Sequence, residues 1–280
     1  MAERELSIEE GQKVALGVLK AFDRICEEER LRYYLMYGTL IGAIRHGGFI
    51  PWDDDIDVMM PRKDFDRFVK YATEHEKELF PLKLHTRANT KGFCFAISRF
   101  SDMRYRYVNT DAYEKTFDIG AFIDIYPWDN FCNTPEEAEK VWRHCRKMNL
   151  TFNRSLIPNN ETDSFRTAVI RKVTYHTLRT LKGKDYDQKI DAKVRDYILA
   201  HTSDTDRYFG HIVWAGGVCQ FDKSKLMDMK AVRHGFAGES FSIPAAYDYL
   251  LTTSYGDYMA LPPEKDRHPS HDYRIFERAL

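Results

Sequence analysis

The sequence has few cysteines and almost no net charge. Its cysteines are odd in number and widely spaced, and none forms a CxxC pair: Cys26, Cys94, Cys132, Cys145 and Cys219. This spacing argues against a disulfide framework and against a structural zinc site. Lysine plus arginine (42) nearly balance aspartate plus glutamate (43). We therefore do not expect a nucleic-acid partner, because general nucleic-acid binders are usually strongly basic.

The chain also lacks long apolar runs, internal repeats and low-complexity tracts. Residues 1–5 are charged and no apolar region follows them, and no stretch approaches the roughly 18 to 20 apolar residues of a membrane span. A hydrophobic fraction of 43% with 14% aromatic residues is ample for a core. These features favour a folded cytoplasmic protein of one elaborated domain or two small ones.

The apolar periodicity predicts strands mainly in the first half of the chain. A capping box at Ser7–Glu10 starts a helix over about 8–30. Further helices are expected at 40–46, 64–80, 135–153, 164–182, 186–200 and 245–254, and strands at 31–36, 56–60, 93–100, 105–109 and 122–126. We expect an α+β fold with a mixed β-sheet core over 1–130. A mainly helical region over 131–280 would complete the site, either as a second domain or within one compact domain.

Four carboxylates lie within five residues, at Asp53, Asp54, Asp55 and Asp57. Like charges this close raise one another's pKa unless a cation neutralises them. Alternate residues of a strand share a face, so Asp55 and Asp57 would project side by side with Cα atoms about 6.6 Å apart. Oxygen ligands suit Mg²⁺ or Mn²⁺. A solvated acidic loop is the weaker reading, because the run leads directly into an apolar strand.

A glycine and a small hydroxyl residue precede this acidic run, at Gly38 and Thr39. They stand where a strand meets a helix, and backbone N–H groups at a helix start, including that of Leu40, bind phosphate well. Arg45 and His46, near the end of the same helix, are candidate phosphate contacts. Charges that complement the helix dipole are an equally good explanation for these two residues.

A further aspartate, Asp124, lies in the centre of an apolar strand at 122–127. A carboxylate is costly to bury there unless it is paired or binds a metal. It would complete the metal site or take the proton from an attacking hydroxyl. The alternative is a local ion pair with Arg99 or Arg104.

These segments together resemble the LicD family of phosphocholine transferases, whose animal relatives include fukutin and fukutin-related protein. The similarity is carried by YGTLIGAIRHGGFIPWDDDIDV at 37–58, FIDIYP at 122–127 and YGDYMALPP at 255–263. It spans roughly residues 30–275 and implies a nucleotidyltransferase-like fold. In that fold a glycine with a small hydroxyl residue holds phosphate, paired acids bind metal, and a third acid follows on a neighbouring strand.

The resemblance implies a metal-dependent phosphotransferase. It would move phosphocholine or a similar phosphoryl-alcohol group from CDP-choline, or another CDP-alcohol, to a sugar hydroxyl of a glycan or lipid-linked glycan (teichoic acid, lipopolysaccharide or capsule). With the patterns above it assigns these roles: catalysis and Mg²⁺ or Mn²⁺ binding to Asp55, Asp57 and Asp124; nucleotide or phosphate binding to Gly38, Thr39, Leu40, Arg45, His46 and Trp52; substrate contact to Arg99, Tyr126, Arg267 and His271.

Other functions compete with this interpretation. A DxD glycosyltransferase would need a longer strand-helix region before residue 55. A true nucleotidyltransferase would make an activated donor and release pyrophosphate. A non-catalytic binder of cations or nucleotides would bind without turnover, and an Asp-x-Asp phosphatase lacks the later lysine and acidic pair that it requires.

Two more segments carry distinct hypotheses. Residues 164–184 contain six basic residues and no acidic one, which is typical of a helix at an anionic membrane surface. The favoured alternative is that this helix packs its apolar face on a core. The segment 268–272 would hold a second metal through His268 and His271, or close over the nucleotide as a basic C-terminal segment.

Overall fold

The computed structural model describes residues 3–109, 111–160, 163–181, 186–212, 217–269 and 271–279. The described strands of the main sheet are β2 (Tyr34–Leu35), β3 (Asp57–Pro61), β4 (Leu82–His85), β5 (Ser98–Asp102), β7 (Ala121–Asn130), β8 (Tyr208–His211) and β9 (Cys219–Asp222). Their order is β2-β3-β7-β5-β4, with β8 and β9 added at the end of β7. Because β3 and β7 are parallel and the other pairs antiparallel, the sheet is mixed and the fold is α+β.

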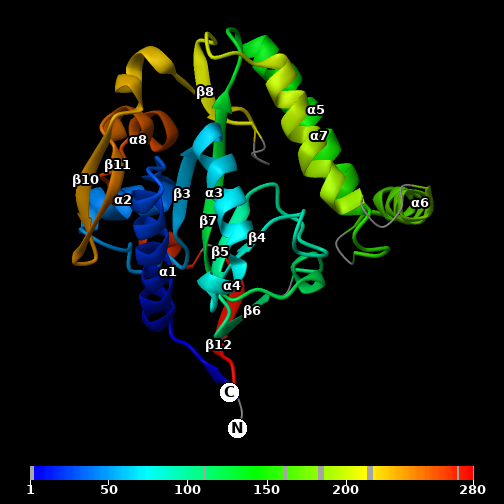
Figure 1. Ribbon diagram of the computed structural model, residues 1–280, viewed down its shortest axis with the longest axis horizontal. Helices are drawn as coiled ribbons and strands as arrows, with labels where there is room; N and C mark the ends of the chain where they lie inside the picture. The colour runs from blue at the N-terminus through cyan, green and yellow to red at the C-terminus, as the bar shows by residue number, and fades with distance from the viewer. Residues whose placement is uncertain are drawn as a thin grey trace.

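Two smaller sheets flank the main one (Figure 1). The first has the order β1-β12-β6 and the second is a hairpin of β10 and β11. Their bounds are β1 (Arg4–Glu5), β6 (Tyr105–Asn109), β10 (Ala231–Phe236), β11 (Glu239–Pro244) and β12 (Tyr273–Glu277). Because β1 pairs with β12, the two ends of the chain lie together at the bottom of Figure 1.

The described α-helices are α1 (Ile8–Glu28), α2 (Tyr37–His46), α3 (Arg62–Glu74), α4 (Glu76–Leu79), α5 (Pro135–Arg154), α6 (Phe165–Leu181), α7 (Tyr186–His201) and α8 (Tyr247–Tyr255). Short 3-10 helices are η1 (Glu114–Thr116), η2 (Lys223–Lys225), η3 (Met227–Met229) and η4 (Glu264–Asp266). No helix within these described ranges is both long and apolar enough to cross a membrane.

Helices α1 and α3 cover one face of the main sheet, in front of the strands in Figure 1. The Phe22 ring of α1 packs edge-on against Phe68 of α3, and Phe68 packs in the same way against Phe100 of β5. Side chains alternate along a strand, so the neighbours of Phe100 point to the opposite face. That opposite face is therefore available for polar residues.

Helix α1 begins at the cap that the sequence predicts, and α5 begins at a similar cap that was not predicted. Ser7 and Thr134 each form a capping box with the glutamate three residues later, which satisfies N–H groups at the helix start. The helices predicted at 135–153, 164–182 and 186–200 are confirmed as α5, α6 and α7. Lys182 and Lys184, in the predicted basic segment, lie outside the described residues.

Other boundaries differ from the sequence-based expectations. The strand predicted at 93–100 begins only at Ser98, and the helix predicted at 64–80 is divided at His75 into α3 and α4. Helices dominate only residues 135–201; residues 208–244 and 273–277 contain the strands β8 to β12, which the sequence did not indicate. These strands pair with β7, β6 or each other. Strands from the second half of the chain therefore join sheets that contain strands from the first half. A division into two domains near residue 130 stays a prediction.

Candidate active site

The strand register places three charged side chains in one row. Asp57 of β3 lies opposite Asp124 of β7, and Asp124 lies opposite Arg99 of β5. All three are buried, on the face opposite to the one that α1 and α3 cover. Asp57 and Asp124, which are far apart in sequence, therefore come together because β3 and β7 are adjacent and parallel.

The carboxylates of Asp55, Asp57 and Asp124 converge. One ligand oxygen from each lies within 4.8 Å of the others. The Oδ1 atom of Asp57 is buried and has no hydrogen-bond partner in the described part of the chain. A buried carboxylate oxygen without a partner is costly, and adjacent like charges add to the cost. This donor set of three carboxylates is one that a single Mg²⁺ or Mn²⁺ ion could share.

The acids carry the electrostatic signature of a site built for a cation. Burial, then the charges of Asp53 and Asp124, raises the pKa of Asp55 to about 7. Burial, then Asp55 and Asp124, raises the pKa of Asp57 well above its usual value. Burial and the charge of Asp54 raise the pKa of Asp53 to about 6. Without a cation, part of this cluster therefore holds protons near neutral pH.

The first turn of α2 lies against the acidic run. The backbone N–H of Asp57 donates to Thr39 Oγ1 at 2.9 Å, so the hydroxyl supports the strand that carries Asp57. A Cβ atom on Gly38 would lie 2.8 Å from Asp53 Oδ2, which requires glycine as long as that carboxylate stays in place. The predicted phosphate donor Leu40 gives its N–H to the carbonyl of Met36 at 3.2 Å.

Arg99 holds Asp124 in place. Its Nε atom donates to Asp124 Oδ1 at 2.8 Å, and Nη1 lies 3.3 Å from Glu114 Oε2. The guanidinium is packed between two rings, 3.9 Å from the centroid of Phe95 and 4.0 Å from that of Phe122. Of the local ion pairs considered for Asp124, the one with Arg99 is present. Arg99 is thus a positioning residue, and its predicted contact with substrate has no support in this geometry.

Arg104, the other candidate partner, pairs instead with Asp102. It lies at the turn between β5 and β6, where both its backbone N–H and its guanidinium donate to that carboxylate. Arg104 is therefore a structural residue.

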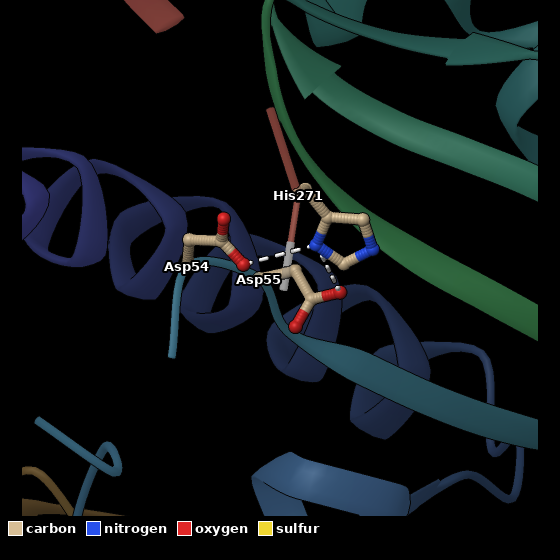
Figure 2. Close-up of side chains that lie close together, drawn as sticks. All are labelled: Asp54, Asp55 and His271. Atoms are coloured by element: carbon tan, nitrogen blue, oxygen red, sulfur yellow. Dashed lines mark hydrogen bonds and ion pairs between the residues drawn. The ribbon is translucent and has the colours of Figure 1, made fainter. Parts of the chain in front are cut away.

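His271 reaches the acidic run from the C-terminal segment. Its Nδ1 atom lies 2.9 Å from Asp54 Oδ1 and 3.6 Å from Asp55 Oδ2, and Figure 2 shows the ring pointing at both carboxylates. The hydrogen bond to Asp54 raises the pKa of His271 to about 9, although burial opposes the shift. Tyr273 in β12 donates its hydroxyl to the Asp54 carbonyl. These contacts tie Asp54 to the C-terminal segment.

The positions of His268 and His271 differ from those expected for a second metal site. Asp54, Asp55 and His271 offer ligand atoms within 4.8 Å of one another, whereas His268 is exposed and faces the carbonyl of Pro269. Of the two residues between them, Ser270 lies outside the described part of the chain. His271 therefore joins the acidic run rather than forming a separate site with its neighbour.

Arg45 and His46, two more of the predicted phosphate contacts, lie at the end of α2. Arg45 donates to the carbonyls of Tyr258 and Ala260, both at 2.8 Å, and so anchors the C-terminal loop to α2. His46 is next to it, and burial lowers the pKa of His46. For both residues, contact with phosphate stays a prediction.

Trp52 and Arg267 lie together beside the run. The Arg267 guanidinium is 5.8 Å from the Trp52 ring centroid, and its Nε atom donates to the Pro262 carbonyl at 2.9 Å. One face of the indole is therefore occupied by a cation. Stacking of Trp52 on a donor base, and substrate contact by Arg267, stay predictions.

The sequence predicted only some of the aromatic residues next to the acids. The Tyr126 ring packs edge-on against Tyr37 at 5.2 Å and against His211 at 4.9 Å. Tyr126 also hydrogen-bonds to Asp57, which opposes the rise in the pKa of that carboxyl. Tyr37, at the helix start, has a positive φ of 51°. Its place directly before Gly38 is the sequence signal that could have marked it.

Comparisons with known proteins agree with this geometry. Residues 30–170 match the family described as LicD/FKTN/FKRP, nucleotidyltransferase domain. Lipopolysaccharide cholinephosphotransferase LicD of Haemophilus influenzae is 29% identical over 281 residues, covering 96% of this chain and 97% of that protein. An uncharacterised protein of Rickettsia typhi is 36% identical over 75 residues, 26% of this chain and 24% of that protein. The family match covers all the converging acids, so the chain belongs to the LicD/FKTN/FKRP family and is an enzyme of the transferase class.

Proposed function

We propose that the protein transfers phosphocholine, or a similar phosphoryl-alcohol group, from CDP-choline to a sugar hydroxyl of lipopolysaccharide. The observation that carries this proposal is the convergence of Asp55, Asp57 and Asp124 beside Gly38 and Thr39. It occurs in a chain that is similar over 96% of its length to a protein named as a lipopolysaccharide cholinephosphotransferase. Teichoic acid and capsule are the alternative acceptors.

The three carboxylates would hold Mg²⁺ or Mn²⁺. The buried and unpartnered Asp57 Oδ1 supports this assignment, because a cation would satisfy it. Such an ion, when bound, neutralises charge on the phosphates of the donor. The protein's own contribution is to fix the carboxylates through the Thr39 hydrogen bond and the Arg99 ion pair.

The transfer is then a substitution at phosphorus. The acceptor hydroxyl oxygen forms a bond to the phosphorus of phosphocholine, the bond from that phosphorus to the CMP oxygen breaks, and CMP leaves. Asp124 would receive the proton of the attacking hydroxyl. The half-buried start of α2 at Gly38 would bind a donor phosphate through backbone N–H groups of its first turn other than that of Leu40, which is already bonded to Met36. The burial of Asp57 and Asp124 would limit the access of water to the reacting groups.

The test is to incubate the purified protein and Mg²⁺ with CDP-choline, CDP-ethanolamine or CDP-ribitol, with and without a choline-free lipopolysaccharide acceptor. Acceptor-dependent release of CMP is expected, and Asp57→Asn should abolish it. Asp196→Asn is the matched control, because that carboxylate is 68% exposed on α7. Release of pyrophosphate from CTP would identify a nucleotidyltransferase instead, and release of neither product would reject both reactions.

We further propose that α6 contacts the inner face of an anionic membrane, where a lipid-linked acceptor would lie. The alternative, that its apolar face packs on a core, is wrong for most of that face. Phe165 is 87% exposed, Val173 61% and Leu181 77%, while Leu178 does pack on the smaller core between α5 and α7. The helix lies at the right-hand edge of the molecule in Figure 1.

The basic residues of α6 indicate which kind of partner covers its exposed apolar face. Phe165, Val169 and Val173 recur every four residues and so share one face of α6, and exposed Arg166 and Lys172 flank them. Apolar residues bordered by cations, with no acidic residue over 164–184, complement an anionic lipid surface.

Co-sedimentation with vesicles of phosphatidylglycerol and phosphatidylcholine tests this contact. Binding to the anionic vesicles should fall when Phe165 and Val173 are both replaced by Ser, and should persist in the Leu199→Ser control, an exposed apolar residue of α7. Equal binding by all proteins would contradict the assignment to α6.

A further inference from the structure

A pocket of about 310 Å³ opens beside the acids, between the start of α2, strand β9 and the end of α8. Its aromatic lining comes from Tyr37, Phe221 and Tyr255, and Gln220 and Ser254 add neutral polar groups. Tyr255 is 47% exposed, so its side chain is accessible. No charged side chain lines this pocket in the described part of the chain.

The polar groups of the pocket are neutral and include an unpartnered oxygen. The Oε1 atom of Gln220 is buried and has no hydrogen-bond partner among the described residues. Burial, then the charge of Asp57, raises the pKa of Tyr255, so the catalytic carboxylates act electrostatically on this pocket. Aromatic faces, an amide oxygen and nearby carboxylates together favour a cation that offers no N–H donor.

We propose that this pocket holds the quaternary ammonium group of the choline that the enzyme transfers. The inference deepens the proposed function and rests on it. Recognition of quaternary ammonium by aromatic rings needs ring faces and nearby negative charge; three aromatic residues line this pocket, and Asp57 lies close enough to act on Tyr255. The phosphate of the same phosphocholine would then lie towards Asp57, on the Tyr37 side of the pocket.

A second pocket near the acids has the opposite chemistry. It measures about 270 Å³ and is lined by Arg87, Arg146, Asn153, Tyr126 and His211. Two guanidinium groups repel a quaternary ammonium and suit hydroxyls or anionic groups. Because Tyr126 packs edge-on against Tyr37, aromatic residues separate this pocket from the first. Of these two pockets, the one lined by Tyr37 and Tyr255 suits the choline.

The test compares CDP-choline with its uncharged isostere, in which carbon replaces nitrogen (CDP-3,3-dimethylbutanol). Tyr255→Leu should lower kcat/KM for CDP-choline by about 2- to 30-fold, the range of a cation–π contact, and change kcat/KM for the isostere by less than about twofold. Tyr255→Phe keeps the ring and should retain the preference for choline. Tyr71→Leu, on the opposite face of the sheet, is the control for replacing a tyrosine.

Calorimetric titration with phosphocholine and Mg²⁺ gives a readout that does not need turnover. Weaker binding to Tyr255→Leu than to Tyr255→Phe supports the pocket even if no acceptor is found. Equal losses on both donors, or a loss in Tyr255→Phe as large as in Tyr255→Leu, would overturn it. If the wild-type protein binds phosphocholine but releases no CMP from CDP-choline, the proposed function fails while the pocket stands.

Discussion

Replacing Asp55 by Asn should stabilise the metal-free protein while destroying its response to metal. Asp55 is buried among Asp53, Asp57 and Asp124, and burial is the largest cause of its raised pKa of about 7. In the unfolded chain the same carboxyl has a pKa of about 3.9. Folding at pH 8 therefore forces a charge into a site that disfavours it.

The size and sign of the effect follow from this difference. A shift of about 3 pKa units corresponds to roughly 4 kcal/mol of unfolding free energy. This value is the upper bound for the stability that Asp55→Asn gains at pH 8. Because folding raises the pKa of this carboxyl, its contribution to the unfolding free energy is fully present below about pH 4. That contribution is lost as the pH rises through about 7. At about 2 °C per kcal/mol, the variant should melt up to roughly 8 °C higher than wild type at pH 8 and at nearly the same temperature at pH 4.

Differential scanning fluorimetry from pH 4 to pH 8, with EDTA or with Mg²⁺, measures both effects. Mg²⁺ should raise the melting temperature of the wild type and of the exposed control Asp196→Asn, but not that of Asp55→Asn. The reasoning is refuted if Asp55→Asn melts below wild type at pH 8 in EDTA, or if Mg²⁺ stabilises it as much as wild type.

Three other substitutions test single contacts. Arg99→Met leaves Asp124 and Glu114 buried without their cation, and urea unfolding should show a loss of about 3 to 5 kcal/mol; an unchanged stability would contradict the ion pair. Thr39→Val leaves the Asp57 N–H without an acceptor, so it should cost about 1 to 3 kcal/mol and lower kcat, whereas Thr39→Ser should restore both. Gly42→Ala would place a Cβ atom 2.4 Å from the Gly48 carbonyl oxygen, and a melting temperature equal to wild type would show that this backbone can move.

Most of the candidate site could be predicted from the sequence because its residues lie close together along the chain. Asp55, Asp57, Gly38 and Thr39 lie within one short segment, so the two acids stay close although β3 begins only at Asp57 and strand alternation, on which the prediction rested, does not extend to Asp55. Asp124 could be predicted because an aspartate among large apolar residues must be satisfied somehow. The family resemblance supplied the roles that such geometry leaves open.

The missing parts depend on contacts between distant segments. His271 meets Asp54 only because β12 pairs with β6, and no local pattern encodes that pairing. Strands β8 to β11 are only four to six residues long and largely half-buried, so their apolar alternation is weak. For α6 the sequence left membrane contact and packing on a core both open and favoured packing, because periodicity shows that a helix has an apolar face but not what covers it.

The most direct test of the central claim is mass spectrometry of a choline-free lipopolysaccharide acceptor after incubation with the protein, CDP-choline and Mg²⁺. We predict that phosphocholine is added to the acceptor in step with CMP release, and that EDTA or Asp57→Asn prevents both. An acceptor that stays unmodified while CTP yields pyrophosphate, or full transfer by Asp57→Asn, would contradict the account.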